Sequence, residues 1–268
     1  MNDYGAELFQ GTAWYYSKYR LLYPASLIRY IIDKFSLNGE GCMLDLGCGS
    51  GQLALRFQDW FEQIVGVDTE PEMLAEANRL SIENRVDHVK WLYGKAEDLA
   101  GDWGALRLTI IAKAFHWMDR EAVLEILYNT TIPNGGIAIV DNDQKQEPLT
   151  WQLKVDEVVK RWLGKERRAG SSVYVPPTER HEVLVAKSKF INVERHVLPS
   201  YVHRWSVETI IGNLYSTSYA ARRFFGDQHE RFEDELRTAL LSLDSEGVFT
   251  EEIPVSIITA FKRVECFI

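Results

Sequence analysis

Three glycines at alternate positions directly follow a short apolar run, and this segment is the part of the chain best suited to bind a cofactor. The run is residues 43–46, and Gly47, Gly49 and Gly51 come next. Glycines after a strand let the backbone turn sharply and let a ligand lie against bare main chain. The helical pattern that begins at Gln52 would point its N-terminus at that ligand. The segment therefore predicts a strand, a cofactor-binding turn and a helix.

Acidic residues follow the next two apolar runs. Residues 64–68 end in Asp68, about twenty positions after the first glycine, where a nucleotide-binding unit places its ribose-binding acid. A carboxylate can accept hydrogen bonds from both ribose hydroxyls. The alternative is that Asp68 only caps the helix that follows. Residues 89–94 form the third run, and Asp98 comes shortly after it.

The fourth apolar run, residues 106–114, leads directly into Phe115-His116-Trp117. In open parallel sheets, ligands bind outside the carboxyl ends of the strands, near the point where the strand order reverses. We therefore expect these three side chains near the cofactor and the second substrate. His116 is a candidate base, and the alternative is a histidine packed among aromatic side chains.

The first segment, read as hhDhGxGxG with Asp45 as its acid, resembles the first motif of the class I S-adenosylmethionine (SAM)-dependent methyltransferases. A dinucleotide-binding turn would instead place its third glycine three residues after the second. Two more segments, Phe-His-Trp at 115–117 and Tyr-x-x-Tyr-Arg at 16–20 followed by Tyr-Pro at 23–24, resemble a small-molecule subgroup. This subgroup includes methyltransferase type 11 and trans-aconitate methyltransferase-like proteins. The resemblance covers roughly residues 14–141.

The resemblance implies an α/β, Rossmann-like fold. We expect a seven-stranded, mostly parallel sheet with an antiparallel last strand, helices on both faces, and a helical cap. The whole chain, residues 1–268, is then a single methyltransferase domain. Its expected parts are an N-terminal lid (1–24), a SAM-binding core (25–141), cap or substrate-side elements (142–189 and 199–247) and a final strand (253–264).

The resemblance also implies the site residues. His116 is the candidate catalytic residue, and no metal ligand is expected. The residues expected to bind the cofactor come from the lid and from the loops after the first four strands: Tyr19, Arg20, Asp45, Gly47, Cys48, Gly49, Gly51, Gln52, Asp68, Thr69, Met73, Ala96, Glu97, Asp98, Ala114, Phe115 and Trp117.

The implied activity is transfer of a methyl group from SAM to an oxygen or nitrogen of a small-molecule acceptor in an aromatic-lined pocket. A positively charged sulfonium makes the methyl group electrophilic, so the protein mainly aligns the acceptor. Three alternatives stay open. The chain could bind SAM in a regulatory or interaction role without turnover, it could be an NAD-dependent oxidoreductase, or it could methylate a macromolecule.

Composition bears on these alternatives. Net charge is −9, from 30 Lys and Arg against 39 Asp and Glu, which argues against a nucleic-acid-binding surface. We expect no membrane span, no secretory leader and a monomer or homodimer. Cys42, Cys48 and Cys266 lack paired metal spacing and suit a reducing cytoplasm. The six histidines show no i, i+4 pair, so we expect no structural metal.

Overall fold

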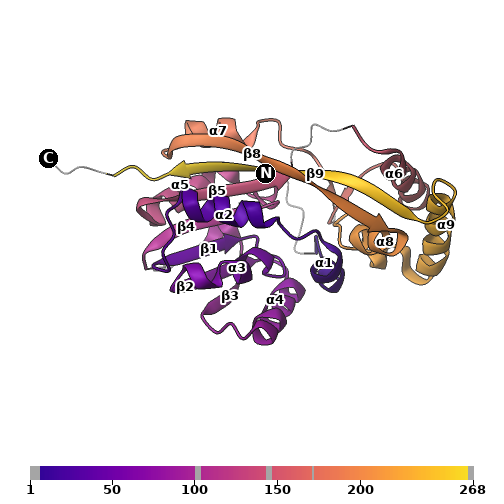
Figure 1. The fold of residues 1–268 in the computed structure, drawn as a ribbon, viewed down its shortest axis with the longest axis horizontal. Helices are drawn as coiled ribbons and strands as arrows, with labels where there is room; N and C mark the ends of the chain where they lie inside the picture. Colours follow the sequence, from indigo (N-terminus) through magenta and orange to yellow (C-terminus); the bar gives the residue numbers. More distant parts are fainter. Residues whose placement is uncertain (1–6, 100–103, 143–146, 171, 265–268) are drawn as a thin grey trace.

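The apolar runs of the sequence form a seven-stranded sheet in a computed structural model, which describes residues 7–99, 104–142, 147–170 and 172–264 (Figure 1). The strand order is β3-β2-β1-β4-β5-β9-β8. Strands β1 to β5 are mutually parallel, and β9 is antiparallel to both of its neighbours. This arrangement confirms the expected fold. The strands are β1 Cys42–Leu46, β2 Gln63–Asp68, β3 Val89–Tyr93, β4 Leu106–Ala112, β5 Thr131–Asn142, β8 Ile191–Ser206 and β9 Val248–Phe261, and a separate small hairpin pairs β6 Arg168–Ala169 with β7 Ser172–Val173.

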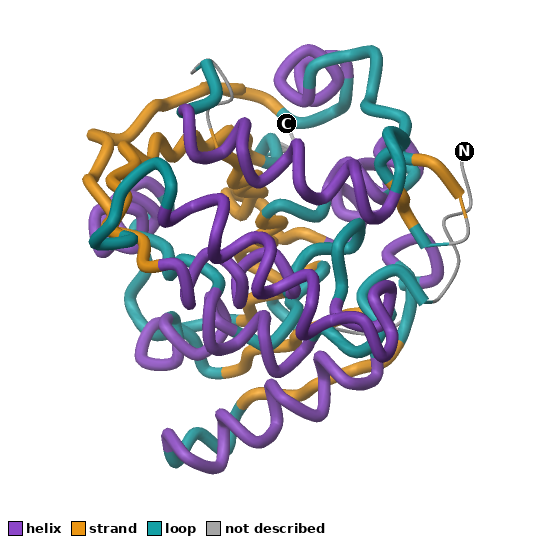
Figure 2. Tube along the Cα trace, turned by 90° about the vertical axis from the view of Figure 1, so that its right-hand side faces the viewer, coloured by secondary structure: helices purple, strands orange, loops and turns teal. Residues whose placement is uncertain are grey.

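Helices cover the two faces of the sheet and form a cap beyond its end (Figures 1 and 2). In the described ranges, none of them is both long enough and apolar enough to cross a membrane. The α-helices are α1 Ala13–Tyr19, α2 Ala25–Lys34, α3 Gln52–Arg56, α4 Pro71–Asn84, α5 Arg120–Thr130, α6 Thr150–Leu163, α7 His181–Lys187, α8 Val207–Tyr215 and α9 His229–Leu241. Short 3₁₀ turns are η1 Gln58–Trp60, η2 Ala96–Asp98, η3 Phe115–Trp117 and η4 Arg222–Gln228.

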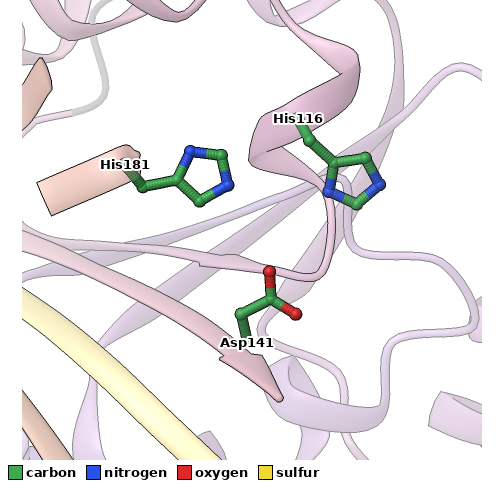
Figure 3. Close-up of side chains that lie close together, drawn as sticks. All are labelled: His116, Asp141 and His181. Carbon is green, nitrogen blue, oxygen red and sulfur yellow. The ribbon is translucent and has the colours of Figure 1, made fainter. Parts of the chain in front are cut away.

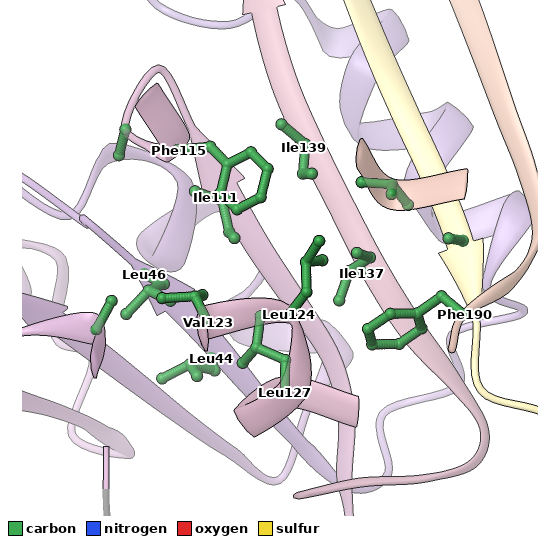
Figure 4. Close-up of a cluster of buried hydrophobic side chains, with 14 of the residues drawn as sticks. Leu44, Leu46, Ile111, Phe115, Val123, Leu124, Leu127, Ile137, Ile139 and Phe190 are labelled. Atoms are coloured by element: carbon green, nitrogen blue, oxygen red, sulfur yellow. The ribbon is translucent and has the colours of Figure 1, made fainter. Parts of the chain in front are cut away.

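The core on one face of the sheet lies under α5 and α7 (Figure 4). Leu44 and Ile137 from the sheet pack with Val123 and Leu127 of α5. All five residues of the central strand β1 are buried, as expected for a strand covered on both faces. The apolar positions of α2 close the opposite face, where Leu27 joins a second buried cluster. The two clusters together fix the strand ends that carry the site.

The hairpin of β8 and β9 is longer than the sequence predicts. The alternation at 190–198 predicts one strand and the final strand is expected to begin at 253, but pairing continues to Ser206 opposite Val248. The register shifts between Leu198 and Tyr201, opposite Pro254. Proline lacks the N–H that a sheet ladder needs, so a bulge forms there and the strands run on. The inserted segment therefore begins after residue 206 rather than at 199.

Strand β5 also begins earlier than the turn signal at residues 133–136 predicts. Leu106 pairs with Thr131 and Leu108 pairs with Gly136, so residues 132–135 form a bulge inside the strand. Asn134 adopts a positive φ of 66° there, which asparagine tolerates better than most residues. The turn residues bend this strand and do not precede it.

The cap has its own apolar cluster, built from α6, the far end of the hairpin, α8, η4 and α9. Figure 2, viewed from the cap end, shows these helices in front of the sheet. Tyr215, Phe225 and Phe232 are buried at its centre, and the rings of Phe225 and Phe232 stack at 3.9 Å between centroids. Aromatic residues of the inserted segments thus build the inside of the cap.

Candidate active site at the carboxyl ends of β1, β2 and β4

The turn after β1 is fastened to the end of β2. Gly47, Gly49 and Gly51 adopt positive φ values of 71°, 52° and 77°. The backbone N–H groups of Gly47 and Cys48 both donate to the Val67 carbonyl, at 2.8 and 3.1 Å. Left-handed backbone at three alternate positions is readily available only to glycine. The glycine spacing therefore sets the path of the main chain at this edge of the sheet.

Two of these glycines are required by close packing. An ideal Cβ on Gly47 would lie under 3.0 Å from the Cβ of Ala114, and one on Gly51 under 3.0 Å from the Trp91 ring. Real Cβ atoms do not approach other atoms so closely. Ala114 thus brings the end of β4 against the turn, and Trp91 fixes the start of α3.

The third glycine faces the N-terminal segment. An ideal Cβ on Gly49 would lie 3.4 Å from the Tyr16 ring, which is ordinary contact. The Arg20 guanidinium lies over the Tyr16 ring, 5.1 Å from its centroid. The segment just before α1 is held to α4 because the N–H of Gly11 donates to Glu72 Oε2 at 2.7 Å. Tyr16 therefore lies against the turn, and the lid role of residues 1–24 stays a prediction.

Tyr19 lies elsewhere. An ideal Cβ on Gly212 of α8 would overlap the Tyr19 ring, and the ring stacks with Tyr15 at 6.3 Å between centroids. The structure therefore brings Tyr16, and not Tyr19, to the glycine turn. The Tyr-x-x-Tyr spacing marks both residues, and the position of α8 decides which of them faces the turn.

Asp68 lies at the end of β2 beside the turn. Its carboxylate accepts hydrogen bonds from the N–H groups of Gly49 at 2.8 Å and Glu70 at 2.9 Å. Burial raises the pKa of Asp68, and these backbone hydrogen bonds, with one from Thr69, oppose the rise. Thr69 itself is exposed, and Met73 is buried in α4. Asp68 thus joins the turn to the start of α4.

Asp45 lies beneath the turn. It is 1% exposed and accepts a hydrogen bond from the Ala54 N–H of α3 at 3.1 Å. Burial raises the pKa of Asp45 to about 7, and the negative charge of Asp68 adds to the rise. The Cys48 thiol is also buried, which raises its pKa well above the usual range. Asp45 therefore orients α3 from below.

The residues after β3 divide into three environments. Ala96 is buried, and Asp98 is exposed. Glu97 accepts a hydrogen bond from the Asp119 N–H at 2.6 Å, which ties η2 to the start of α5. Of the two acids, Asp98 is the one whose side chain faces solvent.

The aromatic residues after β4 also lie in different environments. Phe115 is 1% exposed and belongs to the core, with its ring edge-on to His181 at 5.1 Å. Trp117 faces Phe9 at 6.3 Å and Tyr174 at 5.2 Å between centroids. Phe9 comes from the segment before α1, and Tyr174 directly follows β7. No local sequence motif marks either residue. Together these rings form an aromatic wall beside the turn.

His116, Asp141 and His181 converge from η3, β5 and α7 (Figure 3). One nitrogen or oxygen of each lies within 4.8 Å of those of the other two. Burial lowers the pKa of both histidines to about 4, helped by nearby positive charge that includes Arg120. Both rings are therefore neutral at pH 7.

Two imidazoles and a carboxylate are a donor set that binds transition metals. Arg120 Nη1 lies 3.2 Å from Nδ1 of His181, however, and a guanidinium only donates. Nδ1 of His181 is then the acceptor, and the ring carries its proton on Nε2. This hydrogen bond and the positive charge of Arg120 favour a hydrogen-bonded cluster over an ion site. The three residues are far apart in sequence, so motif spacing could not reveal the cluster.

Several buried polar atoms around the turn lack partners among the described residues. They are the Ser50 hydroxyl, Nε2 of Gln52 and Nε of Arg20. Buried polar groups are normally hydrogen-bonded. A polar ligand lying on the turn would supply partners to all three, so the residues present fit a cofactor with carboxylate, amino and hydroxyl groups.

A cavity of about 300 Å³ opens between the end of β4 and the cap. Arg20 and Lys113 line its core side, and Trp151, Trp205 and Glu251 line its cap side. The glycine turn and His116 are not among its lining residues. Lys113 was not among the expected site residues, although a lysine that interrupts an apolar run at a strand end is a recognisable signal.

The family profile described as "Methyltransferase domain" matches residues 43–135, which span β1 to the start of β5. Residues 43–135 are a methyltransferase domain. The narrower small-molecule subgroup stays a resemblance.

Relatives of the methyltransferase domain are found in distant organisms. An uncharacterized methyltransferase of Schizosaccharomyces pombe is 27% identical over 143 residues, 53% of this chain and 55% of that protein. Another of Mycobacterium bovis is 28% identical over 146 residues, 54% of this chain and 56% of that protein. This chain thus spans about half the length of these relatives.

Solved structures share the fold over most of this chain. The YcgJ protein of Bacillus subtilis has a TM-score of 0.56 at 18% identity, covering 90% of this chain and all of that one. Phosphoethanolamine N-methyltransferase 2 of Haemonchus contortus, in complex with S-adenosyl-L-methionine, has a TM-score of 0.53 at 17% identity. That comparison covers 98% of this chain and 58% of the other. At these identities the likeness concerns the fold alone.

Proposed function

We propose that the whole protein is a SAM-dependent methyltransferase that transfers a methyl group to an oxygen or nitrogen of a small-molecule acceptor. The observation that carries this proposal is the pairing of the glycine turn with Asp68. Gly49 faces the covering Tyr16 ring on one side and donates to the Asp68 carboxylate on the other. This is where a ribose and a methionine chain would lie side by side.

Each expected cofactor contact can be assigned to a side chain. Asp68 would accept hydrogen bonds from the ribose hydroxyls, and the exposed Asp98 would face the adenine amino group. Gln52 and Arg20, whose buried nitrogens lack partners, would bind the polar methionine end. The bound cofactor supplies an electrophilic methyl group on a sulfonium.

The aromatic wall has a different task. Charge disappears as a neutral or anionic nucleophile attacks a sulfonium, so a partly dry pocket favours transfer. Trp117, with Phe9 and Tyr174 against it, would exclude water on the side of the turn nearest η3.

We propose His116 as the catalytic residue. With a pKa of about 4 it is neutral at pH 7 and can accept a proton or a hydrogen bond from the acceptor. A base of such low pKa is weak, so its main contribution is to orient the acceptor. Asp141 and His181 are positioning residues, since they lie beside the ring and limit its orientations.

Isothermal titration with SAM, S-adenosylhomocysteine and NAD tests the cofactor. We expect micromolar binding of the first two and none of NAD; binding of NAD alone would favour an oxidoreductase. Mass spectrometry of reactions with phenols, amines and carboxylates then tests turnover. SAM binding with no methylated product from any of them would favour the non-catalytic, regulatory alternative.

A further inference from the structure

The cavity between the end of β4 and the cap combines apolar walls with charged groups at its two ends. Trp151 and Leu214 are among the residues that form the apolar wall. Arg20 and Lys113 lie on the core side, and Glu251 is on the cap side. Its volume of about 300 Å³ is at the lower end of the range for ligand pockets, about 300–1,000 Å³. The space suits a small organic molecule.

The acids of this cavity already have partners. Glu251 accepts hydrogen bonds from Gln152 at 2.8 Å and from the Trp205 indole at 2.7 Å. Asp156, the other acid in the lining, pairs with Lys160 at 2.5 Å. Glu251 therefore ties the hairpin to α6, whereas the Asp156 pair lies within α6.

The cations lack such partners. Within the described part of the chain, no carboxylate lies within ion-pair distance of Lys113 or Arg20. The Lys113 ammonium lies over the Tyr23 ring, 5.6 Å from its centroid. Arg20 donates to the Ser216 carbonyl at 3.3 Å, and its Nε is buried without a partner. Two adjacent positive groups thus face the same cavity unpaired.

The backbone at Lys113 is held in an unusual conformation. Its φ is 54°, and its N–H donates to the Val140 carbonyl at 2.9 Å. A positive φ is unfavourable for lysine, and the pairing of β4 with β5 offsets this cost in free energy. The next residue, Ala114, is the one that touches Gly47 of the cofactor turn. Lys113 therefore lies between the cavity and the glycine turn.

We propose that this cavity holds the apolar body of the methyl acceptor and that Lys113, three residues before His116 and next to Ala114 at the glycine turn, binds a carboxylate of it, with Arg20 adding positive charge. The inference rests on the proposed function and names the class of acceptor, a small organic carboxylate with an apolar body. A single negative charge fits better than a phosphate, because Glu251 and Asp156 line the same space. Trp151 and its apolar neighbours would cover the body of the molecule.

The pKa of Lys113 supports the same assignment. Burial and the charge of Arg20 lower it to about 8, although Asp141 and Glu251 oppose the fall. A bound carboxylate would relieve this unfavourable environment. Lys113 would then stay protonated above pH 8.

The test compares acids with their uncharged amides. Benzoate, phenylacetate and octanoate, each paired with its carboxamide, are titrated into the full chain loaded with S-adenosylhomocysteine, and binding is followed by calorimetry and ligand-observed NMR. We expect at least one acid to bind about tenfold or more tightly than its amide, since a charge-assisted hydrogen bond is lost in the amide. Lys113→Met should abolish that preference. Equal binding of acid and amide, binding of no acid, or an unchanged preference in Lys113→Met would overturn the proposal.

A matched variant controls for lost surface charge. Lys189→Met removes a lysine whose ammonium pairs with Glu125 at the surface, and it should keep the preference for acids. Arg20 is left intact because it also faces the cofactor turn. Titration of S-adenosylhomocysteine into the unliganded chain is measured separately for both variants. Failure of that titration in the wild type would contradict the proposed function, whereas normal binding of S-adenosylhomocysteine by a wild type that shows no preference for acids would contradict only the carboxylate site at Lys113.

Discussion

The Cβ of Ala114 occupies the space that a side chain on Gly47 would need. Ala114 follows β4 and Gly47 follows β1, so this contact joins the carboxyl ends of two adjacent parallel strands. The glycine turn is thus a packing surface as well as the proposed cofactor site.

Gly47→Ala should therefore destabilise the protein even without cofactor. The φ of 71° and the overlap with Ala114 should together cost about 2 kcal/mol or more in the free energy of unfolding. Urea denaturation measures this cost. Gly94→Ala is the matched control, because nothing lies within 4 Å of its added Cβ. Similar losses in the two variants would contradict the packing role of Gly47.

Asp68→Ala should weaken binding of S-adenosylhomocysteine by more than about tenfold, since two ribose hydrogen bonds would be lost. Asp68 also accepts the N–H groups of Gly49 and Glu70, so Asp68→Asn, which preserves the shape, is measured beside it. Asp87→Asn, at a fully exposed acid, serves as the control. An unchanged dissociation constant in Asp68→Ala, with the fold intact, would refute the ribose assignment.

His116→Ala should lower turnover at saturating acceptor by about a hundredfold if the ring acts as base, and by less if it only orients the acceptor. The wild-type rate should be independent of His116 protonation between pH 5 and 8, since the ring is neutral above its pKa of about 4. A rate that falls instead around pH 6.5 would show that the ring titrates normally. Full turnover in His116→Ala would exclude any catalytic role.

The two buried histidines should also couple stability to pH. Their folded pKa of about 4 lies below the ordinary value of 6.5, so unfolded chains bind protons that the folded state does not. The free energy of unfolding should therefore lose a contribution as pH falls from 6.5 towards 4. His116→Gln with His181→Gln should flatten that part of the curve, as followed by denaturation at each pH. A curve with the wild-type slope would contradict the lowered pKa values.

Asp45 should make the free energy of unfolding depend on pH in the opposite direction. Its folded pKa of about 7 is above the ordinary value of 3.8, so the folded state binds the proton more tightly and loses stability as pH rises from 4 to 7. Asp45→Asn removes this loss and keeps an acceptor for the Ala54 N–H. Relative to wild type, the variant should gain about 1 kcal/mol or more between pH 4 and pH 8. A gain that does not change with pH would contradict the raised pKa.

The core of the fold follows from local patterns. Each of β1 to β3 is a largely apolar run that ends in or is followed by glycine or an acid, β4 is an apolar run that leads into Lys113, and Pro71 begins α4. The full length of the β8–β9 hairpin is not predicted, because Pro199 and Pro254 indicate strand ends. Pairing with the partner strand outweighs that signal, since the ladder resumes on the far side of the bulge.

Only part of the candidate site could likewise be predicted from local sequence. The glycine turn and Asp68 are consecutive features of the chain, so their spacing could be read directly. The neighbours of His116 come from β5 and α7, and Tyr174 comes from the segment after β7. Only the packing of the cap and sheet brings such distant residues together, and no spacing rule covers it. Lys113 lay in a predicted strand, but its cavity depends on the cap.

The long β8–β9 hairpin has a consequence for how the protein melts. The same two strands that complete the sheet edge also carry α8, η4 and α9, and they contribute Trp205 and Phe249 to the apolar cluster of the cap. Separating the cap from the core would therefore break a continuous ladder instead of opening a flexible tether. Cap and core should unfold in one cooperative transition, with coincident fluorescence and circular-dichroism midpoints.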